Sequence, residues 1–390
     1  MAPISAIPPP VITSSHRSNN FDLIRLIAAL QVVIAHAIGH TPLLDTLSGW
    51  QRTTFDWFLK FPGVPVFFVI SGFLIARSYE RSMDDPLGYA WRRCLRIFPA
   101  LWICLIATVA VLAGFGILTS EFVRSGTFWG WLAGQATFVQ FFNPEQFRGF
   151  GIGVANGALW TITVELQFYL FIPLMYLTLL GRWRGRIANL LLLILFSVSF
   201  LTYCRLDLEM NGPGGYAATP MLWKLIFVTL APHLWMFLLG IAIHRHFEGL
   251  RRWLEGKFLL HLVLYVALLV ASALWTTERS FAFYALELPA RGVLALATIA
   301  AAYSARGLAG RMLRGTDISY GVYIYHSIVI NVLVELGWMN SLLSVVWVVL
   351  ITGLLAWLSW TVIEKPALSL KTIAFADLWR RVTGRARALS

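Results

Sequence analysis

Long apolar segments constrain this chain more than any other feature of its sequence. Ten segments of about 20 mostly apolar residues follow one another, and a helix of that length crosses a bilayer. Apolar side chains make up 58% of the 390 residues and charged ones 13%, whereas soluble domains carry about 25% charged residues. We therefore predict an all-α membrane protein, a bundle of about ten transmembrane helices. The predicted spans are residues 21–41, 61–79, 97–118, 158–180, 187–203, 222–243, 258–275, 289–305, 318–337 and 342–363.

The distribution of basic residues predicts the orientation of these spans. The chain carries 31 Lys and Arg against 19 Asp and Glu. If the N-terminus is cytoplasmic, 22 of the basic residues fall in the inner segments and 8 in the outer ones. Because cytoplasmic loops are enriched in Lys and Arg, this split predicts that both termini are cytoplasmic. A basic excess of this origin gives no reason to expect nucleic acid, and the expected surroundings are membrane lipids.

The chain divides into three predicted parts. Residues 1–20 are predicted to be a disordered N-terminal tail, residues 21–366 the transmembrane domain, and residues 367–390 a cytoplasmic basic amphipathic tail. Residues 128–142 are aromatic but too short to cross, so we expect a re-entrant or interfacial segment. Three cysteines without a CxxC pair indicate neither a disulfide framework nor a zinc site, and no metal centre is expected.

Two ionisable residues share one face of the first predicted span. Arg25 and His36 are eleven positions apart, which is three helical turns to within about 20° and about 16 Å along the axis. Because an ionisable side chain inside a span costs roughly 2.5–3.5 kcal/mol, each needs a partner, a cavity or a function. We predict that His36, deep in the outer half, is a general base, since imidazole titrates near neutral pH. A buried imidazole that only donates to a backbone carbonyl is the alternative.

Glu165 lies in the fourth predicted span, at a depth similar to that of His36. A carboxylate bonded to the second ring nitrogen would fix the histidine tautomer and stabilise the imidazolium, as the acid does in a Ser-His-Asp triad. We therefore predict that Glu165 meets His36. A protonated Glu165 that only links neighbouring helices is the alternative.

Arg93 and Arg96 open the third span at the inner surface. Residues three apart on a helix project to the same side, and guanidinium groups bind phosphate bidentately. The pair is therefore a candidate phosphate site. An ordinary positive-inside anchor explains the charge equally well.

Further polar residues are predicted to line a substrate path. Interfacial anchoring accounts for tyrosines at the start of the ninth span but not for a histidine about two turns below the surface. Ser71-Gly72-Phe73 lacks the flanking glycine of a nucleophile elbow, so its small residues are expected to allow close helix packing. The predicted path residues are Ser71, Trp160, Tyr320, Tyr323 and His326.

Five motifs in one order carry a resemblance that covers residues 20–366. They are Arg25-x10-His36, Phe67-Phe68-Val69-Ile70-Ser71-Gly72-Phe73, Arg93-x-x-Arg96-Ile97-x-Pro99, Leu159-Trp160-Thr161 with Glu165, and Ser319-Tyr320-x-x-Tyr323-x-x-His326. On these motifs the chain closely resembles acyltransferase family 3. This family consists of integral O-acyltransferases of the bacterial inner membrane that act on surface and exported glycans.

The resemblance implies ten transmembrane helices, a cytoplasmic acyl-CoA donor and no bound cofactor. It also implies a catalytic role for His36 with Arg25 and a donor-side role for Arg93 and Arg96. We therefore predict an O-acyltransferase that moves an acyl group, most simply acetyl from acetyl-CoA, to a hydroxyl of a lipid-linked or extracytoplasmic saccharide. His36 would take the hydroxyl proton directly or act through an acyl-histidine. The outer loops around residues 142–156 and 207–216 would select the acceptor.

Two other functions fit parts of the sequence. Buried charges among ten helices also suit a transporter or flippase that moves an acyl group or lipid-linked sugar without chemistry. The chain shows no internal repeat and no pair of short helices broken by glycine or proline, which are the marks of that class. Acylation of a small-molecule glycoside shares the whole motif set and differs only in its acceptor.

Overall fold

The computed structural model describes residues 19–180, 186–212, 214–276 and 279–372, and all regular secondary structure in these ranges is helical. This confirms the predicted all-α class. The helices of ten or more residues are α1 (Phe21–Gly39), α3 (Gly49–Leu59), α4 (Gly63–Glu80), α5 (Pro86–Gly114), α7 (Gly126–Ala136), α8 (Trp160–Met175), α9 (Arg186–Met210), α12 (Leu234–Arg245), α14 (Phe258–Trp275), α15 (Phe281–Tyr303), α17 (Ser319–Glu335) and α18 (Leu342–Ser359).

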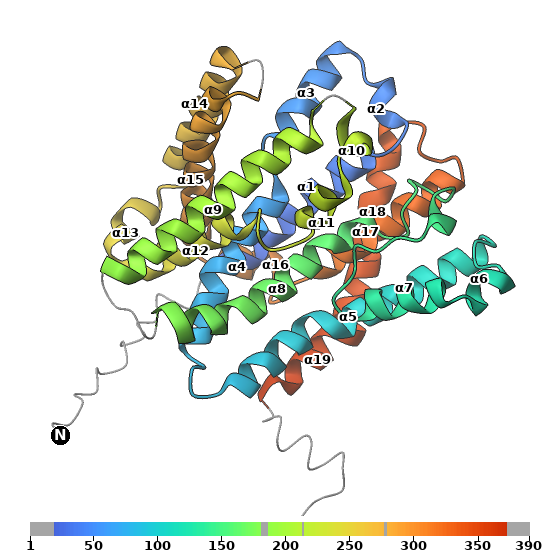
Figure 1. Cartoon of the computed structure of the whole chain (residues 1–390), viewed down its shortest axis with the longest axis horizontal. Helices are drawn as coiled ribbons and strands as arrows, with labels where there is room; N and C mark the ends of the chain where they lie inside the picture. The colour runs from blue at the N-terminus through green and yellow to red at the C-terminus, as the bar shows by residue number, and fades with distance from the viewer. Residues whose placement is uncertain (1–18, 181–185, 213, 277–278, 373–390) are drawn as a thin grey trace, which may run out of the picture.

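Short helices connect or extend these long ones. Two of them are π-helical turns, Tyr176–Leu180 after α8 and Trp360–Glu364 after α18. The short α-helices are α2 (Leu43–Thr46), α6 (Ser120–Arg124), α10 (Gly215–Ala218), α11 (Met221–Phe227), α13 (Phe247–Leu254), α16 (Leu308–Leu313) and α19 (Lys365–Ser369). Figure 1 shows α5, α6 and α7 on one side of the bundle and α14 and α15 on the opposite side.

Within the described residues, eight helical segments are long and apolar enough to cross a membrane, whereas the sequence predicted about ten. They are Phe21–Gly39, Gly49–Glu80, Pro86–Gly114, Gly157–Leu179, Arg186–Met210, Phe258–Trp275, Phe281–Tyr303 and Leu342–Ser369. Each overlaps one predicted span. The two predicted spans missing from this set, 222–243 and 318–337, differ for separate physical reasons.

The predicted span at residues 222–243 is interrupted. It consists of α11 and α12, with non-helical backbone at residues 228–233 that includes Pro232. Side chains of neighbouring helices replace the lost helical hydrogen bonds. Gln167 of α8 accepts from the Leu230 amide at 2.8 Å and donates to the Val228 carbonyl at 3.3 Å. Ser199 of α9 donates to the Ala231 carbonyl at 2.6 Å. Irregular backbone at membrane depth requires such partners, because no water is there to replace them.

The predicted span at residues 318–337 is present as α17. This helix is too short and too polar to be counted among the eight membrane-spanning segments. Its 17 residues measure about 25 Å along the axis, and they include tyrosines, a histidine and an asparagine. Fourteen of them are buried, because α1, α5 and α18 pack around the helix. A helix that faces protein rather than lipid tolerates polar side chains, and so hydropathy underestimates it.

Other boundaries also shift. α15 begins at Phe281 rather than near residue 289, so Arg291, which was counted among the outer basic residues, lies ten residues past the start of the helix. Its charge is paired one turn away, with Nε of Arg291 2.6 Å from Glu287 Oε1.

The predicted interfacial segment 128–142 contains most of α7 and the loop after it. Residues 1–18 and 373–390, most of the two predicted tails, lie outside the described residues, and Asn20 is buried with its side chain donating to the Ser304 carbonyl.

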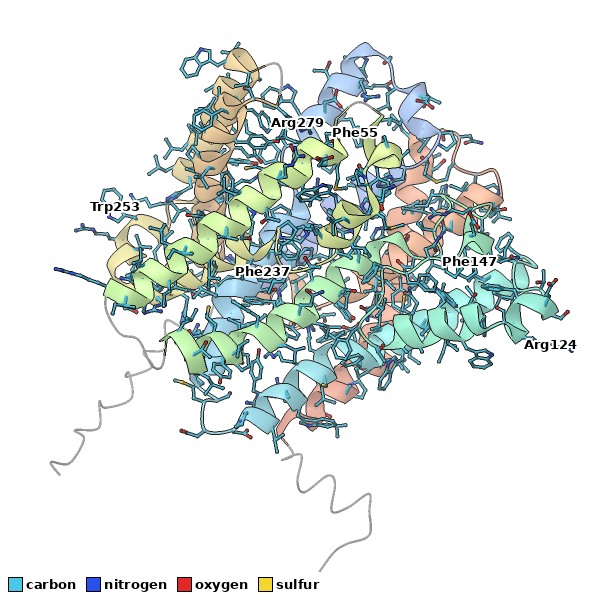
Figure 2. All side chains as sticks on the ribbon, viewed as in Figure 1. Phe55, Arg124, Phe147, Phe237, Trp253 and Arg279 are labelled. Carbon is cyan, nitrogen blue, oxygen red and sulfur yellow. The ribbon has the colours of Figure 1, made fainter. Side chains whose placement is uncertain are left out.

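Two glycines allow α4 and α12 to cross at backbone contact. A Cβ added to Gly72 would lie 2.1 Å from the Phe237 carbonyl oxygen, and one added to Gly240 would lie 2.2 Å from that of Val69. The prediction that small residues near Ser71 serve close helix packing is therefore confirmed. The Phe237 ring stacks on Phe68 of α4 at 4.6 Å and on Phe168 of α8 at 3.9 Å. Figure 2 shows Phe237 in the middle of the bundle.

One carboxylate joins three helices at the end of the bundle where α1, α5 and α17 begin. Oδ2 of Asp317 accepts from Arg25 Nη1 of α1 at 2.7 Å and from Arg96 Nη2 of α5 at 2.6 Å. Oδ1 accepts from the hydroxyl of Ser319, the first residue of α17, at 2.6 Å. Although burial raises the pKa of Asp317, Arg96 and Arg25 lower it more, so the pKa lies below the usual value. The carboxylate is therefore charged at neutral pH.

We predict that Gly72→Ala destabilises the fold by about 1–3 kcal/mol, the usual cost of overpacking. The new methyl group would meet the Phe237 backbone, which has no rotamer to move. Gly292→Ala on α15 is the matched control, because a Cβ there meets nothing within 4 Å. Midpoints of thermal unfolding in detergent should fall for the first variant only. Equal midpoints for the two variants would contradict the close crossing.

We predict that Asp317→Asn destabilises the protein by about 3–5 kcal/mol at neutral pH, because it leaves two buried guanidinium groups without a counter-charge. Since the folded pKa of Asp317 is lowered, this stabilisation is present above the ordinary Asp pKa of about 3.9 and is lost as pH falls through the lower folded value. Unfolding titrations of both proteins should therefore converge at acid pH. A difference that stays constant down to acid pH would contradict the assignment.

Candidate functional site

A cavity of about 500 Å³, called the larger cavity below, runs along the inside of the bundle. Residues of α1, α4, α5, α8 and α17 line it. On α4 the lining extends from Val64 to Ile75, which corresponds to about 16 Å of helix. The cavity is therefore long enough to connect two levels of the bundle. We call the level of Arg25 the arginine end and the level of His36 the histidine end.

Cationic side chains gather at the arginine end of this cavity. Arg25, Arg92, Arg93, Arg96 and Lys371 line it, against the carboxylates of Glu165 and Asp317. An excess of positive charge beside an apolar cavity suits an anionic ligand that carries a less polar extension.

Arg93 and Arg96 have different surroundings. Arg96 is occupied by its ion pair with Asp317. Arg93 lies between two aromatic rings, 5.8 Å from the ring centre of Tyr89 and 5.6 Å from that of Tyr169. Its Nη2 donates to the Ser78 hydroxyl at 3.3 Å, and its buried Nε has no partner among the described residues. The predicted pair is thus split: Arg93 retains donors for a ligand, whereas Arg96 is held by protein.

His36 and His326 are in direct contact. Nδ1 of His36 lies 3.0 Å from Nε2 of His326. Nδ1 of His326 lies 2.6 Å from the Tyr323 carbonyl oxygen. His36 is partly exposed and His326 is fully buried. The residue that sequence analysis placed in a substrate path is therefore the ring partner of the predicted general base.

Glu165 is not that partner, which corrects the expected contact. Within the described part of the chain, it accepts hydrogen bonds from the Tyr169 hydroxyl at 2.5 Å and from the Ser71 hydroxyl at 3.4 Å. Glu165 is the sixth residue of α8, so its carboxylate lies deeper in the cavity than the start of that helix. The predicted depth was wrong, because the Tyr169 ring that bonds Glu165 also packs against Arg93, which places the carboxylate at the arginine end and not at the level of His36.

Arg25 is also remote from His36. It pairs with Asp22 at 3.2 Å and with Asp317 at 2.7 Å, at the opposite end of α1 from His36. Its side chain lines the cavity, which places Arg25 with the other arginines of the arginine end rather than with His36.

Tyr323 lies between the cavity and the histidine pair. Its hydroxyl accepts from Thr161 at 2.8 Å, and both residues line the cavity. Its ring centre is 5.9 Å from that of His326. Ser71 and Tyr320 also line this cavity. Tyr323 therefore separates the larger cavity from His326, and His326 in turn contacts His36.

A second, smaller cavity of about 150 Å³ lies at the histidine end. Residues of three connecting segments contribute to it, including Asn143, Tyr216 and Val228, and Trp160 lines it as well. Nε1 of Trp131, another lining residue, is buried without a hydrogen-bond partner among the described residues. One lining segment, which includes Gly157, is anchored next to the histidines. The Gly157 amide donates at 3.1 Å to the hydroxyl of Ser327, the residue after His326.

Sequence reasoning missed Asp317, Tyr169 and Trp131. Asp317 immediately precedes the ninth predicted span, and the sequence motifs assigned it no role. A signal for it was present in the sequence. Arg25 and Arg96 are both predicted near the inner surface, and neither had been given an acidic partner. In the described ranges no group of three His, Cys, Asp or Glu residues is arranged to hold a metal ion.

Comparison with known proteins gives consistent matches. The sequence model of an acyltransferase domain, acyltransferase family 3, matches residues 18–364. Nodulation protein 10 of Rhizobium leguminosarum bv. viciae is 34% identical over 375 residues, 92% of this chain and 95% of that protein. The O-acetyl transferase of Shigella phage Sf6 is 28% identical over 377 residues, 91% of this chain and 97% of that protein. No solved structure matches the chain.

A third relative is similar over a shorter region. The peptidoglycan O-acetyltransferase of Listeria monocytogenes is 25% identical over 282 residues, which are 68% of this chain and 44% of that protein. The family match covers nearly all of the helical domain that contains both cavities. It confirms the resemblance seen in the five motifs. The chain therefore belongs to acyltransferase family 3 and is a multi-pass membrane O-acyltransferase.

Proposed function

We propose that this enzyme transfers an acyl group, most simply acetyl, from acyl-CoA to a hydroxyl of a saccharide, with His36 as general base. The observation that carries the proposal is the larger cavity. It begins among arginines at one end of the bundle and extends to Tyr323, whose ring packs against His326 of the His36–His326 pair. A donor with an anionic head and a long thioester arm matches that shape and charge.

The donor would bind with its phosphates at the arginine end. Arg93 has free donors and two tyrosine rings that hold its guanidinium plane, an arrangement suited to bidentate phosphate binding. Arg92 and Lys371 add charge at the same end. Arg25 and Arg96 would keep this end assembled through Asp317. We propose that this end faces the cytoplasm of a bacterial inner membrane, which agrees with the predicted cytoplasmic termini.

The reaction would take place at the histidine end. Nε2 of His36 would accept the proton of the attacking hydroxyl while that oxygen forms a bond to the thioester carbonyl carbon. The carbon–sulfur bond then breaks, and the departing thiolate takes the proton from the His36 imidazolium. The products are an ester and free CoA, so no oxidant, reductant or further reactant is needed.

The smaller cavity is the proposed acceptor site. Sugars present hydroxyl groups on an otherwise apolar ring, and binding sites for such ligands combine aromatic surfaces with a few polar groups. Trp131, Trp160 and Phe227 supply aromatic surface, and the unpaired Trp131 Nε1 is a hydrogen-bond donor. The lining includes residues of the two loops, 142–156 and 207–216, that were predicted to select the acceptor. The O-acetyl transferase and peptidoglycan O-acetyltransferase names of two relatives support the same chemistry.

We predict that His36→Ala lowers acyl transfer by about 10²–10⁴-fold, the usual contribution of a general base. His40→Ala is the matched control. His40 is exposed, and its ring centre lies 4.8 Å from that of His36 in an edge-to-face contact, but its ring forms no hydrogen bond with any described residue. Ester content of cell-surface glycans, measured by mass spectrometry in complemented deletion strains, should be lost with the first variant and kept with the second.

Binding of radiolabelled acyl-CoA to the purified variants separates loss of chemistry from loss of folding. His36→Ala should bind the donor as the wild type does, since His36 does not line the larger cavity. Retained ester formation in His36→Ala, together with loss in His40→Ala, would show that the wrong histidine was chosen. Donor transport without ester formation by the wild type would favour a transporter.

We predict that Arg93→Lys weakens acyl-CoA binding about tenfold and Arg93→Ala weakens it further. Lysine keeps the charge but loses the planar fork that binds phosphate with two bonds and stacks between Tyr89 and Tyr169. Titration calorimetry with acyl-CoA measures the change. Cys94→Ser, on the next residue of the same helix, is the control, because Cys94 is exposed and outside the lining. Unchanged affinity in both Arg93 variants would remove Arg93 from the donor site.

A further inference from the structure

We infer that His326 is a positioning residue that holds His36 in the tautomer with its proton on Nδ1. The inference rests on the proposed role of His36 as general base, and it gives His326 a function that the motif did not define. The observation that carries it is an ordered chain of three groups, from His36 through His326 to the carbonyl of Tyr323.

The direction of this chain follows from its last member. A backbone carbonyl oxygen can only accept a hydrogen bond. The 2.6 Å contact with the Tyr323 carbonyl therefore requires that Nδ1 of His326 carries a proton. A neutral imidazole has one protonated nitrogen, so Nε2 of His326 is left as an acceptor. The 3.0 Å contact between the rings then requires a proton on Nδ1 of His36.

The argument depends on a neutral His326, and its surroundings favour that state. The side chain is fully buried. Among the described residues no carboxylate forms an ion pair with it, although such pairs are found for another histidine, His244, with Glu80. Burying an imidazolium without a counter-charge is costly. The opposite direction, in which a doubly protonated His326 donates to His36, is therefore disfavoured.

The consequence concerns the other nitrogen of His36. With the proton fixed on Nδ1, Nε2 keeps its lone pair and is ready to accept the proton of a hydroxyl. Nε2 forms no hydrogen bond with any described residue, and His36 is partly exposed. When Nε2 accepts a proton, the resulting imidazolium still donates from Nδ1 to His326. One orientation of the pair therefore serves both states of the base, as the acid does in a Ser-His-Asp triad.

The first test compares two substitutions at the same buried position. His326→Gln places an amide oxygen within reach of His36 Nδ1 and should retain most activity, whereas His326→Leu removes the acceptor. We expect kcat to fall about 10²-fold or more in His326→Leu, because His36 loses its preferred tautomer. The KM for acyl-CoA should stay unchanged, since His326 does not line the larger cavity. Equal kcat values for His326→Leu and the wild type would overturn the inference.

A matched control separates this role from the loss of any buried histidine. His261 of α14 is 7% exposed and also contacts a backbone carbonyl through Nδ1, that of Lys257 at 2.9 Å. His261→Leu removes an equivalent ring without touching the site. We expect its kcat to match the wild type. A loss as large as that of His326→Leu would make the effect structural and overturn the inference.

The second test reads the tautomer without substrate. In protein with ¹⁵N-labelled histidine, the ring signals of His36 can be assigned as those missing in His36→Ala. The wild type and His326→Gln should show protonated Nδ1 and bare Nε2, and His326→Leu should not. A protonated Nε2 in the wild type would overturn the inference alone. Full activity of His36→Ala would overturn the proposed function instead, so the two failures are distinguishable.

Discussion

The shared carboxylate of Asp317 is the interaction on which the arrangement of the site depends. Two guanidinium groups enter the bundle from different helices, and neither could be placed there without a compensating charge. By accepting from both, Asp317 fixes the beginning of α1 against that of α5. Its bond to Ser319 fixes the beginning of α17 at the same level. The register of α1 against α17 then determines that His36 meets His326 further along both helices.

α17 extends this order from one end of the bundle to the other. Tyr320 donates to the Ile97 carbonyl of α5 at 3.1 Å, and Asn331 accepts from the Ile152 amide at 3.0 Å. Asn331 also donates to the Val154 carbonyl at 2.8 Å, and so it holds the loop that lines the smaller cavity. The polar side chains of α17 are therefore explained by their contacts. Tyr320 and Asn331 are buried, and each bonds to a segment that forms part of the site.

Much of the fold followed from apolar segments, since helix existence in a membrane depends mainly on composition. Eight segments were found where hydropathy placed them, with ends shifted where charges pair within a helix, as for Arg291 and Glu287. The interruption before Pro232 was not predicted, because Gln167 and Ser199, which stabilise it, belong to other helices. Long-range partners of this kind leave no mark in the local pattern.

The site was predictable in its residues more than in its contacts. Eleven-residue spacing placed Arg25 and His36 at opposite ends of one face, and the structure has them there. The partner of His36 was assigned to Glu165 by depth and by charge, but α8 places that carboxylate at the arginine end, beside Tyr169 and Ser71. Spacing along one helix can be predicted from sequence, whereas the level at which one helix meets another depends on packing such as the Gly72–Gly240 crossing.

The two cavities are built from different kinds of structure, and this affects how the protein can diverge. Helix faces line most of the larger cavity, and their positions are fixed by backbone contact and paired charge. Connecting segments supply much of the smaller one, at residues 140–143, 154–157, 216 and 227–228. Loops tolerate insertion and exchange far better than packed helices. Under the proposed function, natural variants can therefore acquire new acceptors by changes in these segments, while the helices around the larger cavity stay the same.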